Sequence, residues 1–220
     1  MKTVAIIPIK KISQRVKNKN FLKINKKPLF RYLLDKIKKC NFDEVYVDSD
    51  SLEVKKYCKK NNLNFIKRVP KLASKNANGN HLLLYHQKII KADLYFQLFV
   101  TSPLMSINTI NKCIKILKTK KKYDSIFTVG EIYSWFWFNN KPVNYNPKTL
   151  PRSQDATPII QETTGLYGIK SPTLKKRKSR IGFRPYLFKV QREELIDLDN
   201  KEDVEFFKFY ASKNPNSTRR

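Results

Sequence analysis

A short basic segment after the first apolar run has the composition of a phosphate-binding loop. It carries the cations and small polar residues Lys10, Ser13, Arg15, Lys19 and Asn20 within eleven residues. Proteins built from alternating strands and helices bind phosphate groups on the loop that leaves a buried first strand. The segment has neither a GxGxxG pattern nor a GKS or GKT sequence, so it is not a dinucleotide fingerprint or a P-loop. On these residues alone, phosphate binding and an ordinary solvated basic loop both stay open.

Two pairs of aspartates have the spacing of a metal site. Asp197 and Asp199 end an apolar run, 194–198, that predicts a strand. Residues two apart on a strand point to the same side, and Mg²⁺ binds one or two carboxylates together with substrate phosphates and water. The alternative for this pair is a solvent-facing acidic strand end. Asp48 and Asp50 form a D-x-D, which resembles the short metal motif of nucleotide-sugar glycosyltransferases.

The histidines and cysteines do not form a recognisable site. His81 and His86 are five residues apart on an expected helix, a rotation of about 500°, so they do not share a face. The three cysteines are Cys40, Cys58 and Cys113. They are widely separated and lack C-x-x-C spacing, which argues against a disulfide framework or a zinc site and indicates a reduced, cytoplasmic protein. We also expect no membrane helix, because no apolar run approaches the ~20 residues that one needs.

The chain has 220 residues and is strongly basic, with 46 Lys and Arg against 18 Asp and Glu and a net charge of +28. This charge suits polyanionic partners such as nucleotides, acidic sugars, nucleic acid or an anionic membrane. Most of the excess is lysine spread along the whole chain, which favours a solvated surface over arginine-rich phosphate recognition. An aromatic run at 133–138 keeps a nucleic-acid-binding protein as an alternative, whose affinity would fall steeply with salt.

Apolar runs and helical periods alternate along the first two-thirds of the chain. Strands are expected at 4–9, 45–47, 65–66, 94–100 and 125–129, and helices from Pro28 to about 40 and at 51–61, 81–90 and 107–117. Later strands at 165–169 and 194–198 precede a last helix at 201–211. The pattern predicts an α/β fold with a Rossmann-like, mainly parallel sheet, helices on both faces and a site at the carboxyl ends of the strands.

Residues 131–164 interrupt the alternation. The segment begins with aromatic residues and continues as a polar stretch rich in Pro and Asn, which indicates a lid or an arm that reaches a partner subunit. The basic cluster at 175–178 is expected in a loop, and 213–220 as a disordered tail. We therefore expect one domain over 1–212 with 131–164 inserted as an arm.

Seven short motifs occur in order between residues 7 and 199. They are Ile7-Pro8 with Ser13-x-Arg15, Lys19-Asn20 and Lys27-Pro28-Leu29; Ser49-Asp50; Arg68-x-Pro70-x-Leu72-Ala73-Ser74; Thr101-Ser102-Pro103-Leu104; Arg152-Ser153-Gln154-Asp155; Gly165-x-Tyr167; and Ile196-Asp197-Leu198-Asp199. With these motifs in this order, the sequence resembles the CTP-dependent sugar cytidylyltransferases, which comprise the acylneuraminate enzymes and the related 3-deoxy-octulosonate (KDO) enzymes. In that family a sugar hydroxyl attacks the α-phosphate of CTP and pyrophosphate leaves, a reaction that depends on positioning and charge neutralisation.

The resemblance implies a role for each matching residue. The triphosphate would be held by Lys10, Ser13, Arg15 and Lys19, with Asn20 beside the ribose and phosphates, and the nucleoside by Arg68 and Ser74. The acidic sugar would lie at Arg152, Gln154, Glu162 and Thr164. Lys19 and Asp199 would act in catalysis, and Asp197 and Asp199 would bind Mg²⁺. The 131–164 arm would reach the partner's site in a homodimer.

The sequence departs from the family pattern mainly at the sugar end. Lys10 stands where Arg is usual and Ile12 replaces Gly, while Phe99, Met105 and Thr164 replace Gln, Arg and Asn. We expect a cytidylyltransferase that transfers CMP to an acidic sugar, either a sialic-acid-like nonulosonate or a related one. The alternatives are a glycosyltransferase that uses the D-x-D and a nucleic-acid-binding protein.

Overall fold

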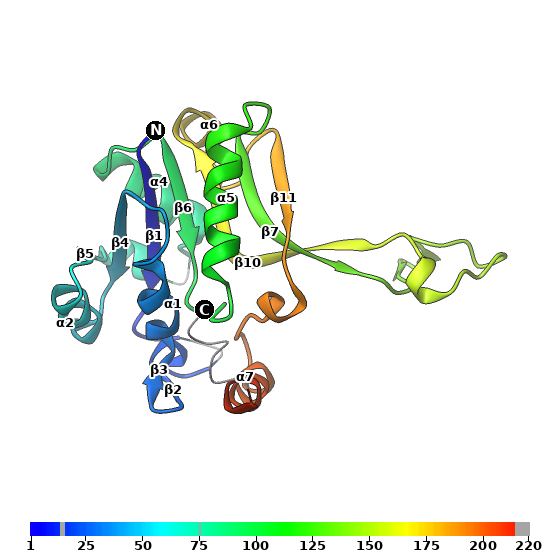
Figure 1. Ribbon diagram of the computed structural model, residues 1–220, viewed down its shortest axis with the longest axis horizontal. Helices are drawn as coiled ribbons and strands as arrows, with labels where there is room; N and C mark the ends of the chain where they lie inside the picture. Colours follow the sequence, from blue (N-terminus) through cyan, green and yellow to red (C-terminus); the bar gives the residue numbers. More distant parts are fainter. Residues whose placement is uncertain (14–15, 75, 214–220) are drawn as a thin grey trace.

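The computed structural model describes residues 1–13, 16–74 and 76–213. Its centre is a seven-stranded sheet in the order β11-β7-β10-β6-β1-β4-β5 (Figure 1). The strands are β1 (Thr3–Ile9), β4 (Glu44–Ser49), β5 (Asn64–Lys67), β6 (Leu94–Leu98), β7 (Ser125–Ile132), β10 (Ile159–Lys170) and β11 (Pro185–Lys189). β10 is antiparallel to both of its neighbours, and the other strand pairs of the sheet are parallel. The predicted α/β fold with a mainly parallel sheet is confirmed.

Helices cover both faces of this sheet. The longer elements are α1 (Leu29–Ile37), α2 (Leu52–Lys60), α4 (Gly79–Ile89), α5 (Ile107–Thr119), α6 (Ser171–Arg177) and α7 (Lys201–Lys213). The shorter ones are α3 (Pro70–Ala73) and the 3-10 turns η1 (Lys19–Phe21), η2 (Ser153–Asp155) and η3 (Arg192–Leu195). The hairpin β2 (Lys23–Ile24) and β3 (Lys27–Pro28) precedes α1. In the described ranges, no helix combines the length and the apolar character required to cross a membrane.

β1 is buried over its whole length because each face of the strand meets a different group of helices. Ile7 and Ile9 pack in the core formed with α1, α2 and α5. Val4 and Ile6 pack on the opposite face with residues of α4 and α6. Burial on both faces explains why this strand is a continuous apolar run in the sequence and why it was readily predicted.

Two local predictions were wrong. The run 194–198 forms η3 and an irregular segment instead of a strand, because the buried carboxylate of Glu194 accepts hydrogen bonds from the backbone N–H groups of Gln191 and Ser106. The basic cluster 175–178 is not a loop: its first three residues form the last turn of α6, where cations favour the helix dipole. Of the tail expected at 213–220, Lys213 ends α7 and 214–220 lie outside the described residues.

Gly168 of β10 lies in a tightly packed part of the sheet, between Phe96 of β6 and Ile126 of β7. A Cβ atom at this position would lie 2.8 Å from Cγ2 of Ile126 and closer still to the ring of Phe96. We expect Gly168→Ala to lower the free energy of unfolding by about 1–3 kcal/mol through overpacking, measured by urea denaturation. Gly130→Ala is the matched control, because the nearest atoms to its Cβ are the terminal methyl groups of the half-buried Leu195 side chain, which can rotate away, so this substitution should cost less. Equal losses would contradict this explanation.

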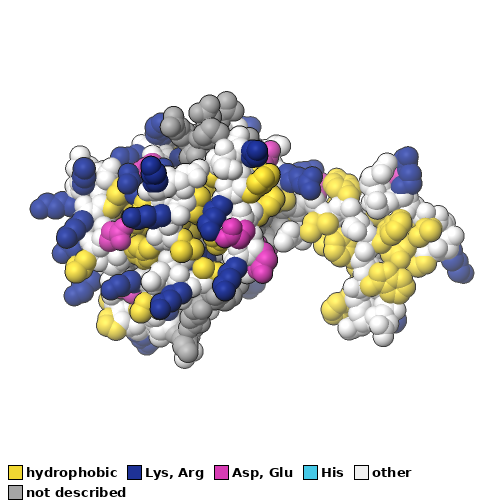
Figure 2. Space-filling model, turned by 90° about the horizontal axis from the view of Figure 1, so that it is seen from below, with side chains coloured by type: hydrophobic (Ala, Val, Ile, Leu, Met, Phe, Trp, Pro, Cys, Tyr) yellow, Lys and Arg dark blue, Asp and Glu magenta, His cyan; other side chains and the backbone are white. Residues whose placement is uncertain are grey.

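β7 and β10 continue past the sheet as a long two-stranded arm (Figure 1). Ile132 pairs with Ile159 at the outer end of the ribbon, and residues 133–158 form the tip, with β8 (Trp137–Phe138), β9 (Lys141–Pro142) and η2. Asn144 is buried in the tip and bonds the backbone of Ser134, Phe136 and Thr157 at 2.7–2.8 Å. Figure 2 shows apolar side chains gathered on the arm, whereas Lys and Arg are scattered over the body.

Candidate active site

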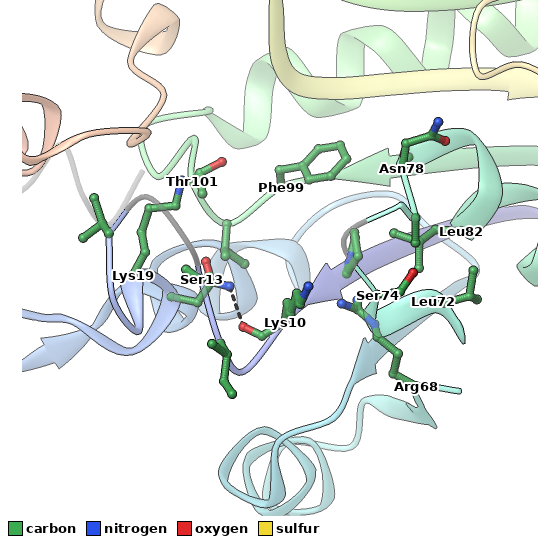
Figure 3. A pocket seen from close by; sticks show the side chains of 17 residues that line it. Lys10, Ser13, Lys19, Arg68, Leu72, Ser74, Asn78, Leu82, Phe99 and Thr101 are labelled. Carbon is green, nitrogen blue, oxygen red and sulfur yellow. Dashed lines mark hydrogen bonds between the residues drawn. The ribbon is translucent and has the colours of Figure 1, made fainter. Parts of the chain in front are cut away.

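A cavity of about 410 Å³ opens beyond the carboxyl ends of β1, β5 and β6 (Figure 3). Its walls come from the segment after β1, from the segment between Arg68 and α4, and from the turn after β6. The predicted residues that line it are Lys10, Ser13, Lys19, Asn20, Arg68 and Ser74. Arg15 lies outside the described residues. The topology therefore brings two distant basic segments of the sequence to one cavity at the expected edge of the sheet.

The loop after β1 is held in place by short-range contacts. The Asn20 side chain donates to the carbonyl of Lys10 at 2.9 Å and so ties the two ends of the loop together. Asn18 adopts a left-handed conformation, with φ of 53°, immediately before η1. Asn tolerates this conformation better than most residues. The turn that follows leaves Lys19 largely buried with its ammonium group at the cavity.

Lys19 joins the loop after β1 to the predicted metal carboxylates. Its Nζ lies 2.9 Å from Oδ1 of Asp199, and the two form an ion pair. Asp197, two residues earlier on the same segment, accepts a hydrogen bond from the Thr164 hydroxyl of β10. The second oxygen of Asp197, Oδ1, is buried and has no hydrogen-bond partner among the described residues. Asp199 thus contacts a residue that lines the cavity, and Asp197 contacts β10.

The alternation of a strand does not explain how these two carboxylates are placed, since 196–199 is irregular. The segment is fixed at both ends instead. The Leu198 N–H donates to the carbonyl of Thr101, in the turn after β6, at 2.8 Å. Asp203 at the start of α7 accepts from the N–H groups of Asp199 and Asn200 at 2.8 and 2.9 Å. The cavity wall and the first turn of α7 thus hold the aspartates.

The D-x-D pair does not form a metal site. Asp48 is fully buried beneath the cavity, where it pairs with Arg68 and His86. Asp50 is exposed, and its Oδ1 accepts from the Lys11 N–H at 2.7 Å. No cluster of three or more His, Cys, Asp or Glu side chains suited to a metal is found in the described part of the chain. The glycosyltransferase alternative therefore loses the feature on which it depended.

The four residues expected at the sugar are not all near the cavity. Glu162 and Thr164 lie on β10, where the pairing with β7 shifts register between Glu162 and Tyr167. Arg152 and Gln154 lie on the tip of the arm, where Arg152 is exposed and pairs with Asp155 at 2.7 Å. None of the four lines the cavity of its own chain within the described residues.

Arg180 is a residue that the sequence analysis missed. Its guanidinium lies 3.6 Å above the centre of the Tyr167 ring and 3.6 Å from the Glu162 carboxylate. It also covers the ring of Phe99, which lines the cavity. Burial raises the pKa of the Tyr167 hydroxyl, and the hydrogen bond to Glu162 adds to the shift. No local pattern marks Arg180, because its partners are distant in sequence.

Lys36 supports the turn after β6 from below and was also missed. Its buried ammonium group donates to the carbonyls of Pro103 and Met105 at 2.6 and 2.8 Å. Burial lowers its pKa to about 8, although the nearby charge of Glu194 opposes the shift. A neutral amine still has N–H bonds for both carbonyls, so the turn remains supported when the proton leaves.

The pKa of Lys36 predicts a pH dependence of stability. A lysine in the unfolded chain titrates near 10.4, so between pH 8 and 10 the unfolded state binds more protons and this group makes stability rise with pH. We expect the unfolding free energy of the wild type, minus that of Lys36→Met, to increase by about 2 kcal/mol over this interval. Urea denaturation of both proteins at several pH values measures the difference. A flat or falling difference would refute the shifted pKa.

The mixed sheet and the basic cavity at its carboxyl edge define an α/β protein, and its fold matches that of solved nucleotidyltransferases. The structure of a CMP:2-keto-3-deoxy-manno-octonic acid synthetase complexed with CTP superposes with a TM-score of 0.72, covering 97% of this chain and 100% of that one at 16% identity. A 4-diphosphocytidyl-2C-methyl-D-erythritol synthase from Anaerococcus prevotii gives 0.65, covering 96% and 98% at 12% identity. Residues 4–210 match the model of the family described as Cytidylyltransferase, so the chain belongs to that family.

Curated relatives carry related names. The pseudaminic acid cytidylyltransferase of Campylobacter jejuni (strain 81-176) is 26% identical, and the match covers 99% of each chain. The N-acylneuraminate cytidylyltransferase of Streptococcus agalactiae (strain 2603 V/R) is 23% identical over 92% of this chain and 52% of that protein. A Helicobacter pylori protein, pseudaminic acid cytidylyltransferase and UDP-2,4-diacetamido-2,4,6-trideoxy-beta-L-altropyranose hydrolase, is 23% identical over 81% and 36%. The chain thus spans about a third to a half of the length of two of these relatives.

Proposed function

We propose that this protein transfers CMP from CTP to a hydroxyl of an acidic sugar, either a sialic-acid-like nonulosonate or a related one, and releases pyrophosphate. The observation that carries the proposal is the cavity itself, where cations from two segments meet beside a pair of carboxylates in a chain of the Cytidylyltransferase family. Concentrated positive charge would neutralise the triphosphate and stabilise charge that develops as pyrophosphate leaves. The domain that does this comprises 1–212.

Each side of the cavity has its own task in this proposal. Lys10, Ser13, Arg15 and Lys19 would hold the triphosphate, with Asn20 keeping the loop closed beside the ribose. Arg68 and Ser74, on the opposite wall, would hold the nucleoside. Lys19 would also act in catalysis, because its ammonium group lies between the cavity and Asp199.

The residues present fit a bound Mg²⁺. Asp197 offers a buried carboxylate oxygen that has no hydrogen-bond partner in the described structure, and Asp199 lies two residues further on. Two carboxylates without further protein ligands are typical of Mg²⁺ sites that are completed by substrate phosphates and water. When bound, the ion would polarise the phosphates and orient them for in-line attack. Thr164 would keep Asp197 turned toward the site through its hydrogen bond.

The arm supports a homodimer in which each subunit completes the sugar site of the other. Large apolar side chains on the arm are exposed, among them Trp137 at 58% and Phe138 at 69%. An exposed apolar patch on a projecting ribbon is typical of an interface. Arg152 and Gln154 lie on the same tip, away from the cavity of their own chain. Arg152 of the partner subunit would thus pair with the sugar carboxylate in a bidentate manner.

The cytoplasm is the proposed location. Cys40, Cys58 and Cys113 are all buried free thiols, and unpaired cysteines are usual where glutathione keeps thiols reduced.

Thermal unfolding in the presence of nucleotides tests the proposal without knowledge of the acceptor. CTP, UTP, ATP, GTP and UDP-sugars are compared, each with and without Mg²⁺. A ligand at 100 times its Kd should add about 2.7 kcal/mol of stability, so a CTP-selective shift that grows with Mg²⁺ is expected. Such a shift leads directly to a screen of pyrophosphate release over acidic sugars. A shift by UDP-sugars with none by CTP would refute the proposal.

A further inference from the structure

A buried polar cluster lies directly beneath the wall of the cavity that contains Arg68 and Ser74 and is proposed to hold the nucleoside. It consists of Asp48 on β4, Arg68 just after β5, and His86 on α4. The side chains of Asp48 and His86 are fully buried and that of Arg68 is 3% exposed. Their neighbours on this face of the sheet, such as Val4, Ile6 and Leu83, are apolar.

Asp48 holds Arg68 at two points. Nε of Arg68 donates to Oδ1 of the carboxylate, and Nη2 donates to the carbonyl of the same aspartate at 3.1 Å. The other carboxylate oxygen, Oδ2, lies 2.8 Å from Nε2 of His86. Burial raises the pKa of Asp48, but the hydrogen bond from His86 and the charge of Arg68 outweigh it and keep the pKa below its ordinary value. Because an ionised carboxylate only accepts, Nε2 of His86 is the donor.

The geometry of the strands brings these groups together. Asp48 pairs with Pro8 of β1 on one side and with Ile66 of β5 on the other, so its carboxylate lies in the middle of this part of the sheet. The Arg68 N–H continues the ladder by donating to the carbonyl of Ser49 at 3.0 Å. Figure 3 shows the Arg68 side chain reaching from this point toward Lys10 in the cavity.

We propose that Asp48 is a positioning residue for nucleotide binding, which acts by fixing the guanidinium of Arg68, and that His86 fixes Asp48 in turn. The role rests on the proposed function, in which Arg68 contacts the nucleotide. A buried ion pair is a poor way to gain stability, because its desolvation cost rivals its Coulomb energy. The planar guanidinium of Arg68, however, is bound to Asp48 through Nε and Nη2, and it therefore presents its remaining N–H donors to the cavity in one orientation.

A double-mutant cycle separates positioning from general stability. Asp48→Asn keeps the shape and removes the charge, and we expect it to weaken Mg–CTP binding about 10-fold in isothermal titration calorimetry, as supporting groups commonly do. Arg68→Ala is expected to weaken binding at least as much. In the Arg68→Ala background, Asp48→Asn should change the Kd by less than about 2-fold, because the two residues act as one unit.

Asp124→Asn is the matched control. Asp124 is another buried carboxylate, which accepts from the backbone N–H groups of Phe183 and Arg184 at 3.0 and 2.9 Å and does not line the cavity. Its substitution should lower the melting temperature without changing the Kd for Mg–CTP. If Asp48→Asn fails to fold, His86→Leu replaces it in the cycle, with an expected loss of about 3-fold, while His86→Gln, which keeps a donor, should retain affinity.

The outcomes distinguish this role from the proposed function. A folded Asp48→Asn with unchanged Kd would overturn the positioning role, and so would a full additional loss in the Arg68→Ala background. For the substitute cycle, an unchanged Kd in His86→Leu has the same meaning. Failure of the wild-type protein to bind Mg–CTP would instead refute the proposed function, and the positioning role with it.

Discussion

Asp199→Asn is expected to lower pyrophosphate release from CTP by at least about 100-fold, because charge stabilisation at the proposed metal site is worth several kcal/mol in the transition state. Asp199 is paired with Lys19 at the edge of the cavity, and its backbone N–H is anchored by Asp203. The amide would still fit this space, so the fold should persist. The measurement is steady-state pyrophosphate release with CTP and an accepted acidic sugar at saturating Mg²⁺, together with the Kd for CTP.

Glu205→Gln is the control for Asp199→Asn. It makes the same change from carboxylate to amide on the exposed surface of α7, where Glu205 pairs only at the surface with Lys208. Its turnover should equal that of the wild type. Near-full activity of Asp199→Asn at saturating Mg²⁺ would show that the metal assignment is wrong.

The double variant Trp137→Ser/Phe138→Ser is expected to separate the proposed dimer into monomers. Both side chains are largely exposed on the arm, and buried aromatic anchors typically contribute 2 kcal/mol or more each to an interface, so the dimer Kd should rise at least about 100-fold. Turnover of the acidic sugar should fall to a similar extent, because Arg152 of the partner subunit would no longer reach the site. Binding of Mg–CTP should persist, since the cavity lies within one chain.

Sedimentation equilibrium at micromolar concentration and calorimetry with Mg–CTP measure the two effects. Phe206→Ser, which removes an exposed aromatic residue of α7 on the body, is the matched control and should leave assembly unchanged. A wild-type protein that sediments as a monomer, or a double variant that stays dimeric, would refute the role of the arm.

The fold was predictable where regular burial of a strand or helix requires regularly spaced apolar residues in the sequence. β1 is an apolar run because helices cover both of its faces, and α1 and α5 show helical periods because one face of each meets the sheet. The strand expected at 194–198 was wrong for the opposite reason. Leu198 is apolar because it packs beneath α7. The backbone before it does not pair with a neighbouring strand, because it is held by hydrogen bonds to the carboxylate of Glu194. Such a contact between distant segments leaves no periodic signal.

The candidate site shows the same division. The cations after β1 were found because they are close together in sequence and follow a buried strand. Asp48 was noticed for its spacing to Asp50, yet its partners lie 20 and 38 residues away, and the D-x-D spacing gave no sign that it faces the interior. Arg180 and Lys36 left no trace, because isolated cations in a lysine-rich chain resemble ordinary surface residues.

The register shift in β10 has a consequence for how the arm can change in length. The shift lies between Glu162 and Tyr167, and the hydroxyl of Thr128 bridges it by contacting Thr163 at 2.6 Å and the Leu166 N–H at 3.2 Å. The register in which β10 pairs with β7 within the sheet, at Gly168, is therefore independent of the register in which the same strands pair toward the tip of the arm. Because strand side chains alternate with a period of two, we expect the ribbon to accept insertions or deletions of matched residue pairs without any rearrangement of the nucleotide cavity. Related chains could thus acquire arms of different reach on an unaltered catalytic body.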